Sequence, residues 1–132
     1  GMALCGGCSL KDVSGLGKLP FWIIHGTADR AVPVKQSKVV VDKLKRDGND
    51  SRLIYDWWQG ANHGMPARVF YMKKTYQWLF SHTLNDSDRP VNRDIDISMG
   101  DVRNAYDGVN RNAPKPELID GPSVIKNEGN EY

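Results

Sequence analysis

An aspartate and a histidine each follow a short apolar run of the sequence, where a turn of small residues begins. Asp29 closes the turn at residues 26–29, and His63 lies within the turn at residues 60–64. A carboxylate can hold an imidazole in one tautomer and stabilise its charged form, and the imidazole can then act as a general base and a general acid. The pair therefore predicts acid–base chemistry. Taken alone, Asp29 is more typical of a turn or capping residue before the helix that follows, and the alternative for His63 is a surface loop histidine.

The apolar runs before these turns predict the elements that position both side chains. We expect strands at residues 2–5, 21–24 and 52–58, and helices over residues 34–47 and from Pro66 onward. The second strand is apolar on both faces, which is typical of a parallel sheet covered on both sides. Strands that alternate with helices favour parallel strands joined by crossovers. Because the carboxyl ends of such strands meet at one edge of the sheet, Asp29 and His63 should lie together there.

Each predicted helix has an apolar face at helical spacing. In the first helix this face consists of Val34, Ser37, Val40, Val41 and Leu44. In the second helix it consists of Val69, Met72, Tyr76, Leu79 and Phe80. Both faces are expected to pack in the core. Gly48 is placed to cap the first helix at its C-terminus.

The composition changes near residue 85. Residues 1–84 contain twelve Lys and Arg against six Asp and Glu, whereas residues 85–132 contain six against ten. We therefore predict an α/β domain at residues 1–84 and an acidic, mostly irregular tail at residues 85–132, with a short helix at residues 101–106. No block of like charges stands out, so the basic excess predicts a solvated face rather than a nucleic-acid site. No apolar run approaches the ~20 residues that span a bilayer.

Further side chains lie near the predicted site. Trp57, Trp58 and Met65 flank it and are candidates to line a substrate pocket, although core packing is an alternative for at least one tryptophan. His25 is expected to be a buried structural imidazole bonded to the backbone. His82 is expected at the surface or near the C-terminus of the last helix.

Two cysteines, Cys5 and Cys8, have the spacing C-x-x-C. A redox pair requires a helix directly after the first cysteine to lower its pKa, and a structural zinc site requires about four ligands. The sequence favours neither, so we expect two small apolar residues at a strand end and no metal. Thiol chemistry stays the weaker alternative.

A nucleophile to complete the acid–base pair is missing. The motif Gly-x-Ser-x-Gly, which marks a sharp turn bearing a catalytic serine, does not occur in the sequence. The nearest approach has Cys8 at its centre, but Leu10 occupies the position that requires a small residue. Cys8 and Ser14 also lie too close before Asp29 for the intervening helix and strand.

The two turns and their flanks resemble the C-terminal third to half of the α/β-hydrolase fold. The similar branches are the phospholipase/carboxylesterase and prolyl-oligopeptidase-like esterases. The motifs that carry the resemblance are Ala3–Gly7, Pro20–Asp29 with Val32-Pro33, Gly60–Gly64 and Trp78–Phe80. The resemblance implies the last three parallel strands of that fold with their crossover helices. It also implies that Asp29 is the acid and His63 the base of a catalytic triad.

The resemblance further implies a serine hydrolase of the esterase or lipase type that acts on a small acyl ester, with no cofactor. The chain departs from the family because the first five strands, the nucleophile and the oxyanion-hole loop are absent. Without the serine, turnover should fall about a million-fold, so we expect the chain alone to be inactive.

A different class of function stays open beside this one. A sheet of three strands has unprotected edges and apolar surface that a partner must cover. The chain is then a non-catalytic remnant that forms a homodimer or binds the missing N-terminal half. The sequence does not indicate the compartment.

Overall fold

The computed structural model describes residues 1–7, 11–88 and 90–105. Its elements are β1 (Met2–Leu4), the 3-10 helix η1 (Ser14–Lys18), β2 (Phe21–Gly26), α1 (Lys35–Arg46), β3 (Leu53–Trp58), the 3-10 helix η2 (Pro66–Tyr71), α2 (Lys73–Phe80) and α3 (Met99–Asn104). The strands form one parallel sheet in the order β1-β2-β3. This confirms the predicted α/β architecture with three parallel strands.

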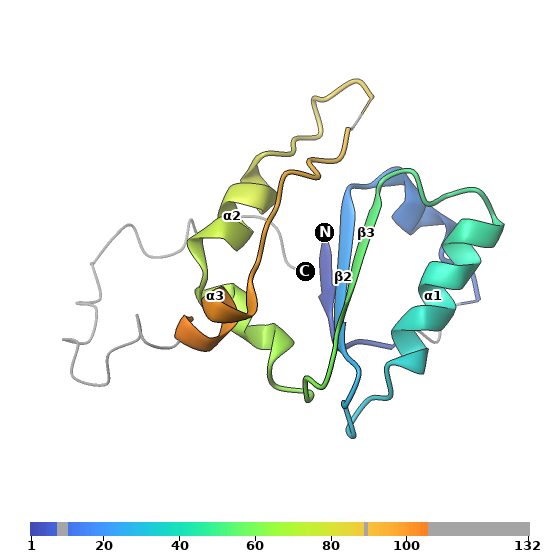
Figure 1. The fold of residues 1–132 in the computed structure, drawn as a ribbon. Helices are drawn as coiled ribbons and strands as arrows, with labels where there is room; N and C mark the ends of the chain where they lie inside the picture. The colour runs from blue at the N-terminus through green and yellow to red at the C-terminus, as the bar shows by residue number, and fades with distance from the viewer. Residues whose placement is uncertain (8–10, 89, 106–132) are drawn as a thin grey trace, which may run out of the picture.

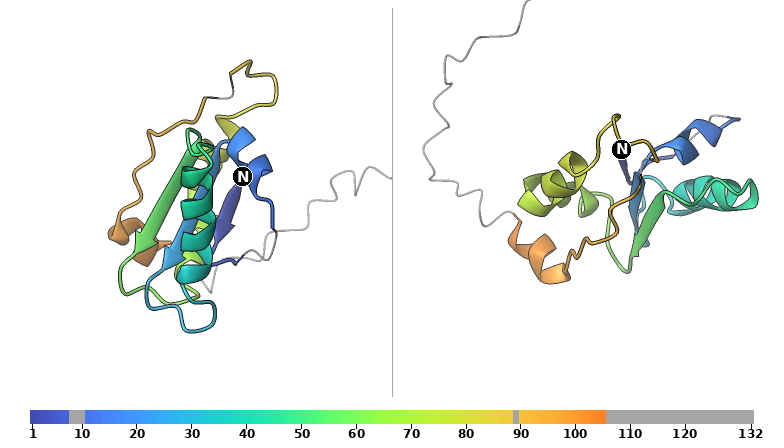
Figure 2. Two further views of the ribbon diagram at one scale, coloured as in Figure 1. Left: turned by 90° about the vertical axis from the view of Figure 1, so that its right-hand side faces the viewer. Right: turned by 90° about the horizontal axis from the view of Figure 1, so that it is seen from above.

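Helices cover both faces of the sheet. α1 lies on one face, and α2 and α3 lie on the other (Figures 1 and 2). β2 is buried on both sides as expected, because Ile23 packs in the cluster beneath α1 while Trp22 and Ile24 pack in the cluster on the α2 side. The edge of the Trp22 ring meets the ring of Trp78, with 5.3 Å between centroids. The central strand is therefore fixed from both faces.

Helix α1 follows the sequence prediction closely. Its buried residues are Ser37, Val40, Val41 and Leu44, and Lys43, Lys45 and Arg46 lie in its last turn. Gly48 follows with φ +68°, a left-handed conformation that glycine adopts at low cost.

The prediction of a single helix after Pro66 is wrong. The backbone is extended at Met72 and divides the segment into η2 and α2. The break shifts the helical phase, so Val69 and Met72 are buried as predicted but Tyr76 and Phe80 are exposed. Thr75 and Trp78 face the core instead. A proline can begin a helix, but no local signal in the sequence marks where this first turn ends.

Residues 90–105 pack against the sheet and α2. Val102 and Ala105 belong to the same core cluster as Trp22, and the Trp78 indole donates to the carbonyl oxygen of Asn92 at 2.7 Å. The short helix predicted at residues 101–106 is observed as α3, with Ser98 and Asp101 forming a capping box at its start. The predicted domain boundary after residue 84 stays a prediction.

Arg93 covers part of the edge of β3, donating to the carbonyl oxygens of Ser51 at 2.9 Å and Leu53 at 3.1 Å. Across the described part of the chain, none of the helices combines the length and apolar character that a membrane span requires.

Candidate active site

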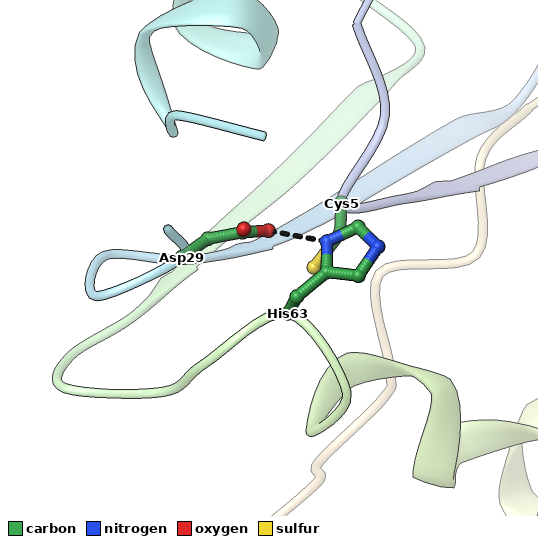
Figure 3. Close-up of side chains that lie close together, drawn as sticks. All are labelled: Cys5, Asp29 and His63. Carbon is green, nitrogen blue, oxygen red and sulfur yellow. Dashed lines mark hydrogen bonds and ion pairs between the residues drawn. The ribbon is translucent and has the colours of Figure 1, made fainter. Parts of the chain in front are cut away.

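The loops after β2 and β3 bring the predicted acid and base together. Nδ1 of His63 lies 2.7 Å from Oδ2 of Asp29, within hydrogen-bond distance (Figure 3). Both side chains stand at the carboxyl-terminal edge of the sheet, because β2 and β3 are parallel and Gly26 pairs with Trp58 at their ends. The expected juxtaposition of these two side chains is therefore observed.

Backbone hydrogen bonds join the two loops. The amides of Thr27 and Ala28 donate to the carbonyl oxygens of Trp58 and Ala61, each at 3.0 Å. The loops approach so closely at Gly26 that a Cβ there would overlap the backbone of Ala61. A glycine at this position is thus a condition for the contact between the two loops.

The carboxylate of Asp29 is buried and held in one orientation. Its Oδ1 accepts hydrogen bonds from the backbone amides of Ala31 at 2.9 Å and Val32 at 2.8 Å, which leaves Oδ2 to face the imidazole of His63. Burial alone would raise the pKa of Asp29, but the hydrogen bonds from Val32, His63, Ala31 and Cys5 together hold that pKa well below its usual range. Asp29 is therefore ionised at neutral pH and is a fixed negative charge beside the ring.

His63 stands in a more open loop. The side-chain oxygen of Asn62 accepts hydrogen bonds from the amides of Gly64 at 3.1 Å and Met65 at 3.2 Å, which shapes the turn. About half of the His63 side chain (51%) is exposed, and its Nε2 points away from Asp29 (Figure 3). One ring nitrogen is thus oriented by a carboxylate while the other is accessible to a reacting group.

His25 is buried and bonded to the backbone, as predicted. Its Nε2 lies 2.8 Å from the carbonyl oxygen of Val32 and 3.2 Å from Oδ2 of Asp29. Oγ of Ser37 donates to the carbonyl oxygen of Gly6, so Nδ1 of His25 supplies the proton between His25 and Ser37, 2.7 Å apart. Both ring nitrogens of His25 therefore face oxygen atoms that can accept a hydrogen bond.

The sequence reasoning missed the contact between His25 and Asp29. The spacing of four residues between them was visible, but it has no fixed meaning at the end of a strand. Only the turn that follows β2 brings the carboxylate back against the ring.

Cys5 also lies at the site, which the sequence did not predict. It is buried directly after β1 and has φ +49°. Its sulfur, an oxygen of Asp29 and a nitrogen of His63 all lie within 4.8 Å of one another (Figure 3). Burial raises the pKa of the Cys5 thiol, a hydrogen bond with the Gly26 backbone lowers it, and the nearby Asp29 raises it further. The end of β1 therefore adds a thiol to the pair of side chains.

An open hollow of about 650 Å³ lies beside His63, a size in the range of small-molecule sites. Its lining residues are Ala28, Arg30, Ala31, Asn62, His63 and Gly64.

The three pocket candidates from the sequence, Trp57, Trp58 and Met65, are not among the residues that line this hollow. Trp58 is buried in the core on the α2 side and Met65 packs against that core. Trp57 packs on the α1 side, where Lys38 Nζ is 5.7 Å from its ring centroid. Their role as pocket residues stays a prediction.

Other candidates lie outside this edge or outside the described residues. Cys8 belongs to the residues that the structure does not describe. Ser14 opens η1, which precedes the amino end of β2 and so lies away from Asp29. His82 is half-buried rather than a free surface residue, because its Nδ1 lies 2.8 Å from the Trp78 carbonyl oxygen and its Nε2 accepts from the Asn92 amide at 2.9 Å.

The sequence profile of the prolyl oligopeptidase family matches residues 10–86, which is more than half of the chain and includes both Asp29 and His63. The chain belongs to the prolyl oligopeptidase family. The match confirms the resemblance to the esterase and peptidase branch of the α/β hydrolases. No curated protein matches the chain.

A solved structure is also similar to this member of the prolyl oligopeptidase family. It is titled "Crystal Structure of a Thermostable Esterase", with 26% sequence identity and a TM-score of 0.52. The match covers 61% of this chain and 23% of that esterase. The chain thus spans about a quarter of the length of the similar enzyme. The partial match agrees with the predicted partial α/β-hydrolase fold.

Proposed function

We propose that this chain is the C-terminal part of a serine hydrolase of the esterase type, in which Asp29 is the triad acid and His63 the base. The observation that carries the proposal is the contact of 2.7 Å between His63 Nδ1 and Asp29 Oδ2, made between loops that follow adjacent parallel strands. This is the hydrogen bond by which a carboxylate orients a catalytic imidazole.

The two nitrogens of His63 then have separate roles. Nδ1–H donates to the buried carboxylate, while Nε2, on the exposed side of the ring, takes the proton of a serine hydroxyl as that oxygen attacks an acyl ester. The same nitrogen returns the proton to the leaving alcohol, and a water molecule then releases the acid by the reverse sequence. Asp29 stays ionised and stabilises the imidazolium that forms in each step.

The serine belongs to the missing part of the enzyme. Among the described residues we identify none on a strand-to-helix elbow facing His63, and the oxyanion donors are expected from the same missing part. We propose that the chain alone has no appreciable esterase activity, since loss of a triad serine costs about a million-fold in turnover. A small acyl ester is the proposed substrate of the complete enzyme, and a peptide substrate is the alternative that the family name suggests.

Labelling with a fluorophosphonate tests the missing nucleophile. The chain should not react, whereas a longer product of the same reading frame should be labelled, and His63→Ala in that longer product should abolish labelling. Labelling of the short chain would overturn its proposed inactivity.

Nitrogen NMR of the histidine rings tests the acid–base pair without any activity. In the unmodified chain, Nδ1 of His63 should carry a proton that is protected from exchange, and Asp29→Asn should remove that protection. His82→Gln is the matched control, because His82 bonds to Trp78 and Asn92 instead. A ring proton of His63 that exchanges equally fast with and without the Asp29 carboxylate would contradict the pairing.

An open edge of the sheet favours a second function, that of a non-catalytic module that forms a homodimer. In the described residues β1 pairs with β2 alone, so its outer edge has backbone groups without a strand partner. An apolar hollow lies between this edge and α1, with Ala3, Leu16, Phe21, Ile23 and Val40 in its wall. Light scattering coupled to size-exclusion chromatography should then give twice the mass of one chain. A monomer at every concentration would contradict a function that depends on a homodimer.

A further inference from the structure

Three side chains with different donor atoms meet at the carboxyl-terminal edge of the sheet. Cys5 follows β1, Asp29 follows β2 and His63 follows β3, so each strand contributes one donor (Figure 3). We propose that this cluster is a zinc-binding site, with Sγ of Cys5, Oδ2 of Asp29 and Nδ1 of His63 as the ligands. The proposal rests on this geometry and is independent of the proposed hydrolase function.

The donor atoms suit zinc better than the hard cations. Zinc binds thiolate, imidazole and carboxylate groups, whereas magnesium and calcium prefer sites made of oxygen atoms alone. Three protein ligands leave the fourth tetrahedral position for water. His63 is the half-exposed ligand and lines the open hollow, so we expect the ion and that water to approach from its side.

The distances require only local movement. Metal–ligand bonds of about 2.0–2.3 Å in a tetrahedron place the donors roughly 3.3–3.8 Å apart. The present donors lie within 4.8 Å of one another, and His63 Nδ1 lies 2.7 Å from Asp29 Oδ2. Binding therefore requires the His63 ring to shift by about 1 Å. That ring is the exposed member of the cluster, whereas Cys5 and Asp29 are buried at strand ends.

The surroundings of the carboxylate support a metal ligand. The amides of Ala31 and Val32 hold Oδ1, so Oδ2 is directed into the cluster. His25 lies 3.2 Å from the same Oδ2. Such neighbouring hydrogen bonds orient ligands in established metal sites.

Protons and charges balance in the binding step. The Cys5 thiol loses its proton to solvent, and the proton on Nδ1 of His63 moves through solvent to Nε2. Asp29 is already ionised, so one thiolate and one carboxylate neutralise the two charges of the zinc ion. Because the metal occupies both Nδ1 and Oδ2, it breaks the hydrogen bond between Asp29 and His63. Zinc-bound protein therefore lacks the oriented imidazole.

Cobalt(II) is the spectroscopic probe for this site. The purified full chain, first treated with a chelator, is titrated with cobalt(II), and zinc is then added in competition. We expect the absorption bands of a tetrahedral ion with a thiolate-to-metal charge-transfer band, both removed by one equivalent of zinc. Calorimetry with zinc gives the affinity.

Variants separate this cluster from other donors. Cys5→Ser and His63→Gln should each weaken binding about 100-fold or more, since even the indirect neighbours of metal ligands change affinity by about 10–100-fold. Cys8→Ser and His82→Gln are the matched controls and should retain the affinity and the spectrum. Circular dichroism checks that each variant is folded. Cys5 is buried, so Cys5→Ser can unfold the protein. His63 is half-exposed, so His63→Gln tests the site if Cys5→Ser does not fold.

Three results would overturn the proposal. The first is loss of binding in Cys8→Ser, which assigns the metal to the C-x-x-C pair. The second is unchanged binding in His63→Gln, and the third is cobalt binding without a charge-transfer band. Each of them leaves the NMR test of the Asp29–His63 pair unaffected, so the two proposals fail separately.

Discussion

The loops after β2 and β3 form the two halves of the site in different ways. The Asp29 loop is buried, and backbone amides, His63 and the nearby His25 surround its carboxylate. The His63 loop is held mainly by the turn at Asn62, and half of its histidine side chain faces solvent. Asp29 is therefore buried within the fold, whereas His63 lies in a surface loop.

This difference suits the roles that we propose for the two groups. A carboxylate that orients an imidazole requires a fixed position and no exchange with solvent, and burial provides both. A base that exchanges protons with a substrate requires access and room to turn. In the proposed zinc site, the same difference would let the His63 ring move toward the metal while Asp29 and Cys5 stay in place.

The largest expected contrast is between the two histidines that contact Asp29. His25→Ala removes a fully buried ring together with its contacts to Ser37, Val32 and Asp29. The free energy of unfolding should fall by about 3 kcal/mol or more, since the change leaves a buried cavity and removes a hydrogen bond to the Val32 carbonyl oxygen, and a buried polar group left unpaired costs about 1–3 kcal/mol.

His63→Ala is the matched variant and should cost less than about 1 kcal/mol, because water can replace an exposed ring. Urea unfolding of both variants measures the difference. Equal losses would contradict the contrast between the loops.

A smaller effect is expected at the glycines of the same two loops. Gly26→Ala would place a methyl group into the backbone of Ala61 and should destabilise the protein by about 2–3 kcal/mol. Gly64→Ala places its methyl at an ordinary contact distance of 3.7 Å from Asn62 Oδ1 and should change stability by no more than about 0.5 kcal/mol. Thermal unfolding of the two variants measures the difference. If Gly26→Ala were as stable as the unmodified protein, the two loops would not be tightly joined.

The sequence predicted the strands and the loop of Asp29 better than it predicted the other side chains around that carboxylate. The run at residues 21–24 is apolar on both faces and ends in a turn of small residues, so it predicted a strand that is buried on both sides, as β2 is. The parallel strands then fixed which edge Asp29 and His63 share. These inferences succeeded because hydrophobic periodicity is a local property, and because strands that alternate with helices favour parallel pairing.

Contacts between distant segments were beyond the same reasoning. Cys5 reaches the site because β1 pairs with β2. The sequence predicted Cys5 at a strand end, but it contains no sign that this side chain lies beside Asp29 and His63. The backbone is extended at Met72, which breaks the predicted helix, and after the break Trp78 turns inward and packs against Trp22. In both cases tertiary contacts override a local pattern.

The smallest expected effect is the dependence of stability on acid, which measures how firmly the fold holds Asp29. The pKa of Asp29 is lowered in the folded state from an ordinary value of 3.8, with burial opposing and hydrogen bonds from Val32, His63 and Ala31 favouring the ionised form. A lowered folded-state pKa adds stability that is fully present above the unfolded pKa and is lost as the pH falls toward the folded one. The free energy of unfolding should therefore decrease below about pH 4.

Asp29→Asn should flatten that decrease, because the amide does not titrate, even though the variant is less stable at neutral pH. Asp42→Asn, at an exposed position of α1, is the control and should follow the unmodified protein throughout. Urea unfolding at a series of pH values from 7 to 3 gives the three curves. If the Asp29→Asn curve ran parallel to that of the unmodified protein, the carboxylate would not be held by the loop, and the distinction between a fixed acid and a mobile base would be lost.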